Sequence, residues 1–230
     1  MTDIPSTSST SFASSAETII DRPAFSVRRL YVSEMNNAVY LLIAHATDER
    51  ILIDAADDAD ALLQFVGAGG ARSSLKWILT THAHWDHTRA TAALAASTGA
   101  PVAIGADDAE QLRAERGLTA DLLLEHGDRL EFGGVVLEAI GLRGHTPGSM
   151  AFALSDDAGP TVLFTGDSLF PGGVGNTQGD EDRFASLFRD VTERLFDRFD
   201  DDTIVLPGHG ASTTLGAERP SLPEWRERGW

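Results

Sequence analysis

The sequence contains no cysteine. A disulfide is therefore impossible, and thiolates are excluded as metal ligands. Basic residues are also scarce, since 18 Lys and Arg stand against 35 Asp and Glu, for a formal net charge of −17. Proteins that bind the phosphate backbone need basic patches. We therefore expect no nucleic-acid partner.

Long apolar runs are missing as well. No stretch approaches the roughly 20 apolar residues that a membrane-spanning helix needs, and the N-terminus lacks a basic region followed by an apolar core. These absences, with the lack of cysteine, lead us to expect a cytoplasmic protein with no membrane partner. The sequence has no Gly-x-Ser-x-Gly elbow, which argues against a serine hydrolase.

The 230 residues, 42% of them hydrophobic, suffice for one sizeable domain. Residues 1–24 are rich in Ser and Thr and lack periodicity, so we expect a disordered leader there and a single domain over 25–230. Apolar patterning predicts two runs of strands, each followed by helices. The predicted strands cover 27–32, 38–44, 51–54, 75–79, 101–104, 129–132, 135–142, 150–154, 161–164 and 203–206, and the predicted helices cover 57–66, 88–98, 107–116 and 184–199.

A dense cluster of histidines follows the apolar run 75–79. His82, His84 and His87 lie with Asp86 within six residues. Imidazole and carboxylate are ligands that zinc and similar divalent ions prefer. His82 and His84, two residues apart in extended backbone, point to the same side, whereas Asp86 and His87 follow as the chain turns. One metal ion can hardly use all four groups and keep a position open, but two adjacent ions can.

Three more potential ligands occur later, each beside a strand-like run and among glycine or proline. His145 lies in Gly-His-Thr-Pro-Gly, Asp167 in Thr-Gly-Asp, and His209 in Pro-Gly-His. Such backbone turns sharply and presents one side chain. A histidine-rich polar loop without metal is the alternative interpretation, and these later motifs make it a poor one.

His-x-His-x-Asp-His, Gly-His-Thr-Pro-Gly, Thr-Gly-Asp and Pro-Gly-His, in this order over about residues 38–215, resemble the metallo-β-lactamase superfamily, and most closely its glyoxalase II-type thioesterases. The resemblance implies an α/β fold, a four-layer αβ/βα sandwich with its metal site at the edge between two sheets. It also implies that one metal is held by His82, His84 and His145, the other by Asp86, His87 and His209, with Asp167 bridging them.

Two further residues are expected to orient these ligands. Asp54 ends the predicted strand 51–54, where a carboxylate can hydrogen-bond a metal-bound histidine, and Thr81 can fix the backbone of the same loop. A simple turn residue remains the alternative for Asp54. Arg143, two residues before His145, can meet either an anionic substrate group or a surface carboxylate. The isolated His45 and His126 are expected at the surface or in turns.

The first functional hypothesis is a binuclear metallohydrolase, glyoxalase II-like, that cleaves S-acyl conjugates of a small thiol. A water shared by two divalent ions becomes hydroxide near neutral pH, with Asp86 as the catalytic proton acceptor. We expect zinc, with iron or manganese as alternatives. A thioester suits this site because its thiolate, with a parent pKa near 8.5, departs without a proton donor.

Two alternatives stay open. A lactonase or β-lactamase-type hydrolase shares the chemistry, and a mononuclear iron persulfide dioxygenase carries a similar motif set. After His209 about twenty residues remain, too few for the helical domain that grips glutathione in the glyoxalase II family, so another thiol such as mycothiol is a candidate. The expected partner is a small acyl-thiol, and the expected assembly a monomer or homodimer.

Overall fold

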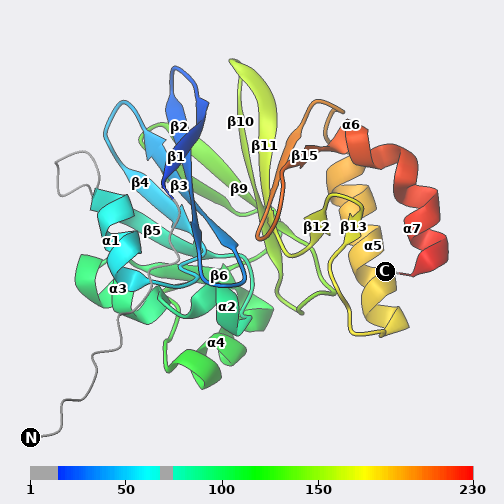
Figure 1. Ribbon diagram of the computed structural model, residues 1–230, viewed down its shortest axis with the longest axis horizontal. Coiled ribbons are helices and arrows are strands. Elements are labelled where there is room, and N and C mark those ends of the chain that lie inside the picture. Colours follow the sequence, from blue (N-terminus) through cyan, green and yellow to red (C-terminus); the bar gives the residue numbers. More distant parts are fainter. Residues whose placement is uncertain (1–14, 68–74, 230) are drawn as a thin grey trace, which may run out of the picture.

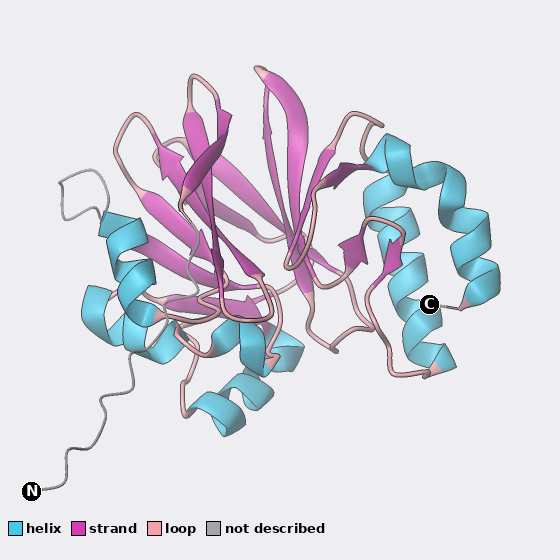
Figure 2. Ribbon diagram, viewed as in Figure 1, coloured by secondary structure: helices cyan, strands magenta, loops and turns pink. Residues whose placement is uncertain are grey.

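The structure, a computed structural model, describes residues 15–67 and 75–229. Two mixed sheets face each other (Figures 1 and 2). The first sheet has the order β1 (Glu17–Asp21), β2 (Phe25–Val32), β3 (Asn37–Ala44), β4 (Arg50–Ile53), β5 (Leu75–Thr80), β6 (Val102–Gly105) and β7 (Leu122–Leu124). The second has the order β15 (Thr213–Thr214), β14 (Ile204–Pro207), β11 (Gly159–Gly166), β10 (Met150–Asp156), β9 (Val135–Gly141) and β8 (Arg129–Phe132), and β12 (Leu169–Phe170) pairs with β13 (Gly173–Val174).

Helices cover the outer faces of both sheets. The first sheet carries α1 (Ala59–Gly67), α2 (Trp85–Thr88), α3 (Thr91–Thr98) and α4 (Ala109–Arg116), which follows a 3-10 turn at Ala106–Asp108. The second carries α5 (Glu181–Val191), which continues as a π-helical turn at Thr192–Phe196, then α6 (Leu215–Glu218), a 3-10 turn at Arg219–Ser221 and α7 (Leu222–Arg228). In Figure 1, α1 and α3 lie at one side of the molecule and α5 and α7 at the other.

The core consists of three apolar clusters, and these explain the unbroken apolar strands. In β3, Tyr40 and Leu42 pack between the sheets, whereas Val39 and Leu41 pack under the helices of the first sheet. A strand covered on both faces needs apolar residues at every position, so it reads as a continuous run. The third cluster joins the second sheet to α5 and α7, where Trp225 is fully buried. The result is the expected four-layer αβ/βα sandwich.

Strand direction brings the predicted ligand loops to one edge of this sandwich. β4, β5 and β6 are parallel, so the loops that follow them lie side by side. In the second sheet, β11 and β14 are parallel and Gly166 pairs with Pro207. Asp167 and His209, which follow these strands, therefore leave the sheet at neighbouring points.

The predicted leader is wrong in part. Glu17–Asp21, expected to be disordered, form β1, which pairs antiparallel with β2. The polar sequence hid this strand because an edge strand with partly exposed faces needs no apolar run. Residues 1–14 lie outside the described part of the chain, so the division at residue 24 otherwise stays a prediction. Within residues 15–67 and 75–229, no helix is long and apolar enough to cross a lipid bilayer.

Candidate metal centre

Three histidines from both sheets meet at the shared edge, and we call them the first trio: His82, His84 and His145. His82 Nε2 lies 3.0 Å from His84 Nδ1, which in turn lies 2.9 Å from His145 Nε2. His82 and His84 follow β5 of the first sheet, and His145 lies in the loop between β9 and β10 of the second. His84 thus presents Nδ1 where its two neighbours present Nε2.

The second trio consists of Asp86, His87 and His209. His209 Nε2 lies 3.1 Å from His87 Nε2 and 3.2 Å from Asp86 Oδ2. Asp86 and His87 lie on α2, a single turn that redirects the chain directly after His84. The short helix explains why four donors so close in sequence face two different points.

Asp167 lies between the two trios. Its Oδ1 is 3.4 Å from His87 Nε2, and its Oδ2 is 3.8 Å from His145 Nε2 and 3.6 Å from His209 Nε2. The carboxylate therefore reaches members of both trios. All seven predicted ligands are brought together, and His82, His87 and Asp167 form a further ligand group that spans the trios.

The outer nitrogens of the histidines are held by acceptors. His87 Nδ1 lies 2.8 Å from Asp54 Oδ2, His145 Nδ1 2.9 Å from the carbonyl of Asn176, and His209 Nδ1 3.1 Å from the carbonyl of Met35. A carbonyl or carboxylate oxygen can only accept, so we assign the proton to each outer nitrogen. When such a ring is neutral, its inner nitrogen then carries a lone pair that faces the centre.

Asp54 and Thr81 form one hydrogen-bonded unit beneath both trios. Asp54 is buried and accepts from the Thr81 amide and from the Thr81 hydroxyl, each at 2.8 Å. The Thr81 oxygen also lies 3.0 Å from His82 Nδ1. Asp54 therefore holds His87 directly and His82 through Thr81.

Electrostatics distinguish the two trios. Burial lowers the pKa of His82 well below its ordinary value, and burial also lowers the pKa of His145. For His87, burial opposes the charge, but the carboxylates of Asp54 and Asp167 raise its pKa well above the ordinary value. The first trio thus favours neutral rings, which is the metal-binding form of imidazole.

The arrangement fits a pair of divalent cations. Nitrogen lone pairs that face each other at about 3 Å repel unless a cation lies among them. The buried Oδ1 of Asp167 has no hydrogen-bond partner among the described residues, although it borders the same space. A donor set of imidazole and carboxylate, with oriented outer nitrogens, is what a site for zinc, iron or manganese requires.

Sequence reasoning missed two buried polar residues that join the sheets at this site. Asn37 donates from Nδ2 to Asp86 Oδ2 at 3.0 Å, and the same nitrogen lies 3.3 Å from His209 Nε2. Asp108 contacts the loops of the first trio. The signal for Asn37 was faint, since it is a lone amide at the start of an apolar strand. Sequence reasoning also missed Gly208. A Cβ at this position would lie 2.5 Å from Asp167 Oδ1, so the close approach of Asp167 requires glycine there.

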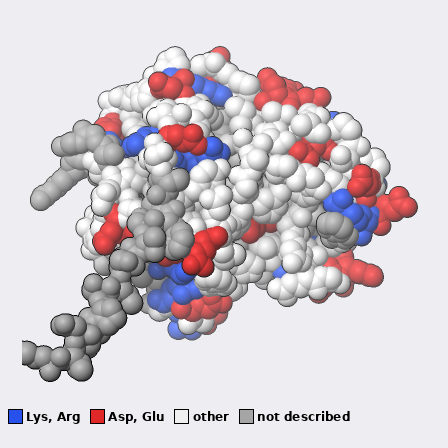
Figure 3. Space-filling view, in the orientation of Figure 1, with Lys and Arg blue, Asp and Glu red and all other residues white. Residues whose placement is uncertain are grey.

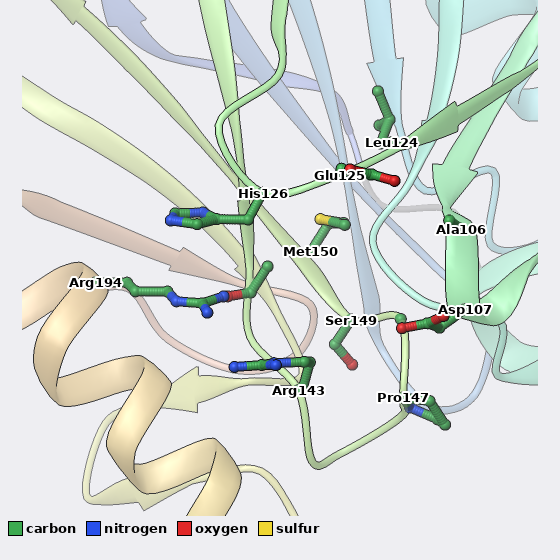
Figure 4. Close-up of a pocket in the computed structure, with 12 residues that line it drawn as sticks. Ala106, Asp107, Leu124, Glu125, His126, Arg143, Pro147, Ser149, Met150 and Arg194 are labelled. Carbon is green, nitrogen blue, oxygen red and sulfur yellow. The ribbon is translucent and has the colours of Figure 1, made fainter.

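Arg143 pairs with a carboxylate. Its Nε and Nη2 donate to the two oxygens of buried Asp190, at 2.8 and 2.9 Å. Figure 4 shows Arg143 beside a pocket of about 200 Å³, with Arg194 pointing toward it from the π-helical turn. His126 also borders this pocket, whereas His45 is exposed near Asp21. Neither of these histidines belongs to the two trios.

The fold and the donor set define a protein of the αβ/βα class with a candidate metal centre, and comparison with known proteins identifies the family. Residues 34–209 match the metallo-β-lactamase superfamily. A hydroxyacylglutathione hydrolase-like protein of Mus musculus is 39% identical over 142 residues, or 61% of this chain and 47% of the mouse protein. The chain thus spans about half the length of that relative.

Two further comparisons cover more of the chain. Hydroxyacylglutathione hydrolase GloC of Haemophilus influenzae is 32% identical over 187 residues, which are 75% of this chain and 85% of that protein. The crystal structure of ETHE1 from Myxococcus xanthus superposes with a TM-score of 0.74 at 30% identity, and covers 87% of this chain and 84% of its own. The chain belongs to the metallo-β-lactamase superfamily, and its donor groups form a site that can hold divalent metal ions.

Proposed function

We propose that the chain is a binuclear metallohydrolase that cleaves thioesters between an acyl group and a small thiol. The observation that carries this proposal is the convergence of six donors as two trios around Asp167. The glyoxalase II-like relatives support the thioester as substrate. The two ions, with zinc expected and iron or manganese as alternatives, would acidify water and polarise the substrate carbonyl.

His82, His84 and His145 would hold one ion, Asp86, His87 and His209 the other, and Asp167 both. Asp86 has a second task in this proposal. Burial alone would raise its pKa, but hydrogen bonds with His209 and Asn37 hold the pKa of Asp86 well below the usual range. The carboxylate is therefore an anion at neutral pH, the form that both a metal ligand and a proton acceptor require. The departing thiolate, with a parent pKa near 8.5, needs no proton donor.

The charge distribution favours a small molecule over nucleic acid as the partner. In Figure 3, Asp and Glu side chains are spread over the visible face among smaller groups of Lys and Arg. With a net charge of −17, the chain offers little attraction for a phosphate backbone. We also propose that the protein acts in the cytoplasm, as a monomer or a homodimer.

A panel of substrates tests the proposal on protein whose metal content has been measured. We expect two ions per chain and faster cleavage of a hydroxyacyl thioester of glutathione or mycothiol than of the matched oxygen ester, a lactone or a β-lactam. Because the chain has no cysteine, a thiol reagent reports only the released thiol. Faster turnover of the lactone or β-lactam would replace the thioesterase by the corresponding hydrolase.

The measured metal content also distinguishes the proposed hydrolase from a mononuclear iron persulfide dioxygenase. A mononuclear site would use one trio, whereas here both trios are complete and joined by Asp167. One iron per chain together with oxygen consumption would contradict the binuclear hydrolase.

A further inference from the structure

Asp108 is a buried carboxylate directly before α4, and capping this helix does not explain its position. It stands at the N-cap of α4, where an aspartate ordinarily accepts a hydrogen bond from the first turn of the helix. Here the side chain makes no such bond. The residue is fully buried, and a buried carboxylate is costly unless donors satisfy it. Its donors lie elsewhere.

Both oxygens of Asp108 accept from the loops that carry the first trio. Oδ2 accepts from the Ala83 amide at 2.9 Å, and Ala83 is the residue between His82 and His84. The same oxygen accepts from the Thr146 hydroxyl at 2.7 Å, and Oδ1 accepts from the Gly148 amide at 2.7 Å. Thr146 directly follows His145. One carboxylate therefore joins the two loops, although they belong to different sheets.

The neighbouring groups are arranged for this contact. At Gly148, a Cβ would lie 2.4 Å from the Asp108 amide nitrogen and 2.9 Å from its Cβ, so no side chain fits there. The Ser149 hydroxyl lies 2.6 Å from the Thr146 hydroxyl, and it can donate to Thr146 while Thr146 donates to Asp108. The last glycine of the Gly-His-Thr-Pro-Gly motif is thus required by the approach of Asp108.

From these contacts we infer that Asp108 is a positioning residue for the first trio, which sets how tightly His82, His84 and His145 hold their ion. No hydrogen bond joins it to any of the three imidazoles, and it acts through the Ala83 and Gly148 amides and the Thr146 hydroxyl, which lie in the loops that carry them. Only a carboxylate serves, because all three partners are donors, whereas an amide side chain has one acceptor oxygen and would turn its NH₂ toward another donor. The second trio is joined across the sheets by Asn37 instead.

The inference rests on the proposed metal roles, and Asp108→Asn tests it with metal affinity as the readout. Groups that orient metal ligands typically change affinity by about 10–100-fold. In competition with a chromophoric chelator at pH 7, we expect Asp108→Asn to weaken one of the two ions by that factor and to leave the other unchanged. The exposed neighbour is the matched control, so Asp107→Asn should bind both ions like the wild type.

A second background shows which trio is affected. In Asp86→Asn protein the ion that remains should occupy the first trio, and cobalt substitution gives it a visible absorption spectrum. Adding Asp108→Asn should shift this spectrum and weaken that ion. The inference is overturned if the folded double variant keeps the spectrum and the affinity of the Asp86→Asn protein. It is also overturned if Asp108→Asn alone weakens the binding of both ions equally.

If the Asp108→Asn variant does not fold, substitutions of Thr146 test the same contact. Thr146→Val removes one of the three hydrogen bonds, whereas Thr146→Ser retains the hydroxyl. We expect Val alone to weaken the first ion, by several-fold, and equal affinities in the two variants would refute the role of the contact. The wild type separates this inference from the proposed function. A chain that binds two ions but cleaves no thioester would contradict the thioesterase and leave the role of Asp108 standing.

Discussion

The first trio is made of three imidazoles, whereas the second combines two imidazoles with the carboxylate of Asp86. Behind the second trio stands a further carboxylate, Asp54, 2.8 Å from His87 Nδ1. In the first trio, the outer nitrogen of His145 contacts the backbone carbonyl of Asn176, and that of His82 contacts the Thr81 hydroxyl. The second site therefore attracts a cation largely by charge, and the first by the placement of neutral lone pairs. We expect substitutions that alter charge to act on the second trio and those that alter loop geometry on the first.

Asp167→Asn should have the largest effect because this carboxylate approaches both trios. We expect both ions to be weakened and thioester turnover to fall by about 10³-fold, as for the loss of a central electrostatic group in a catalytic site. Elemental analysis and a thiol-release assay measure the two effects. The exposed Asp182→Asn serves as the control. Loss of only one ion would show that the trios do not share Asp167.

Asp86→Asn should act on the second trio alone. The substitution removes a charged ligand and the proposed proton acceptor, so we expect turnover to fall by about 10²-fold with one ion retained per chain. Circular dichroism checks that the fold survives. Near-normal turnover would remove Asp86 from the catalytic role, and loss of both ions would contradict the separation of the trios.

Asp54→Asn should weaken both ions unequally. Asn tolerates the positive φ of 60° at this position, so the backbone can stay in place. Asp54 holds His87 directly but reaches His82 only through Thr81. We expect about 10–100-fold weaker binding at the second trio and a smaller change at the first, measured by chelator competition. A larger loss at the first trio would reverse the comparison.

Asp190→Asn should have the smallest effect on metal binding, and of the two ions it should weaken only the one at the first trio. Burial would raise the pKa of Asp190, but its hydrogen bonds with Arg143 hold the pKa below the ordinary value. The pair therefore stabilises the fold above about pH 4, the unfolded value, and this contribution is lost as the pH falls through the lowered pKa.

We expect Asp190→Asn to lower the free energy of unfolding by about 2 kcal/mol at pH 7 and by less at pH 3. Urea unfolding at the two pH values measures this difference. Arg143 adjoins the His145 loop, so the first ion alone should weaken slightly. A stability loss independent of pH would show that the ion pair is not its source.

The convergence of the seven donor side chains was predictable from the sequence because their chemistry is concentrated in a few short motifs. Histidine and aspartate among glycines leave few other interpretations, and parallel strands bring such loops together. Asp108 and Asn37 were not predictable in the same way. Two of the three partners of Asp108 are backbone amides, which every sequence offers at every position. Asp108 also lies inside the predicted helix 107–116, so nothing in the sequence set it apart from the other charged residues of that helix.

The fold was predictable where burial on both faces produced continuous apolar runs, as in β3 and β4. It was not predictable at the edges. Glu17–Asp21 form a strand whose residues stay partly or fully exposed, so no pattern marked it. The predicted helix 88–98 begins three residues later, at Thr91, because the preceding residues Trp85–Thr88 form the separate helix α2.

Each trio takes two donors from the segment that follows β5, which includes α2, and one from a loop of the opposite sheet. A cation bound at either trio would link the two sheets at the edge of the sandwich, outside the apolar interior. Ion loading and the docking of the two sheets would then be thermodynamically linked, so that chelation lowers the unfolding temperature as well as abolishing turnover. The rim that carries out the chemistry would thereby also keep the two layers in register.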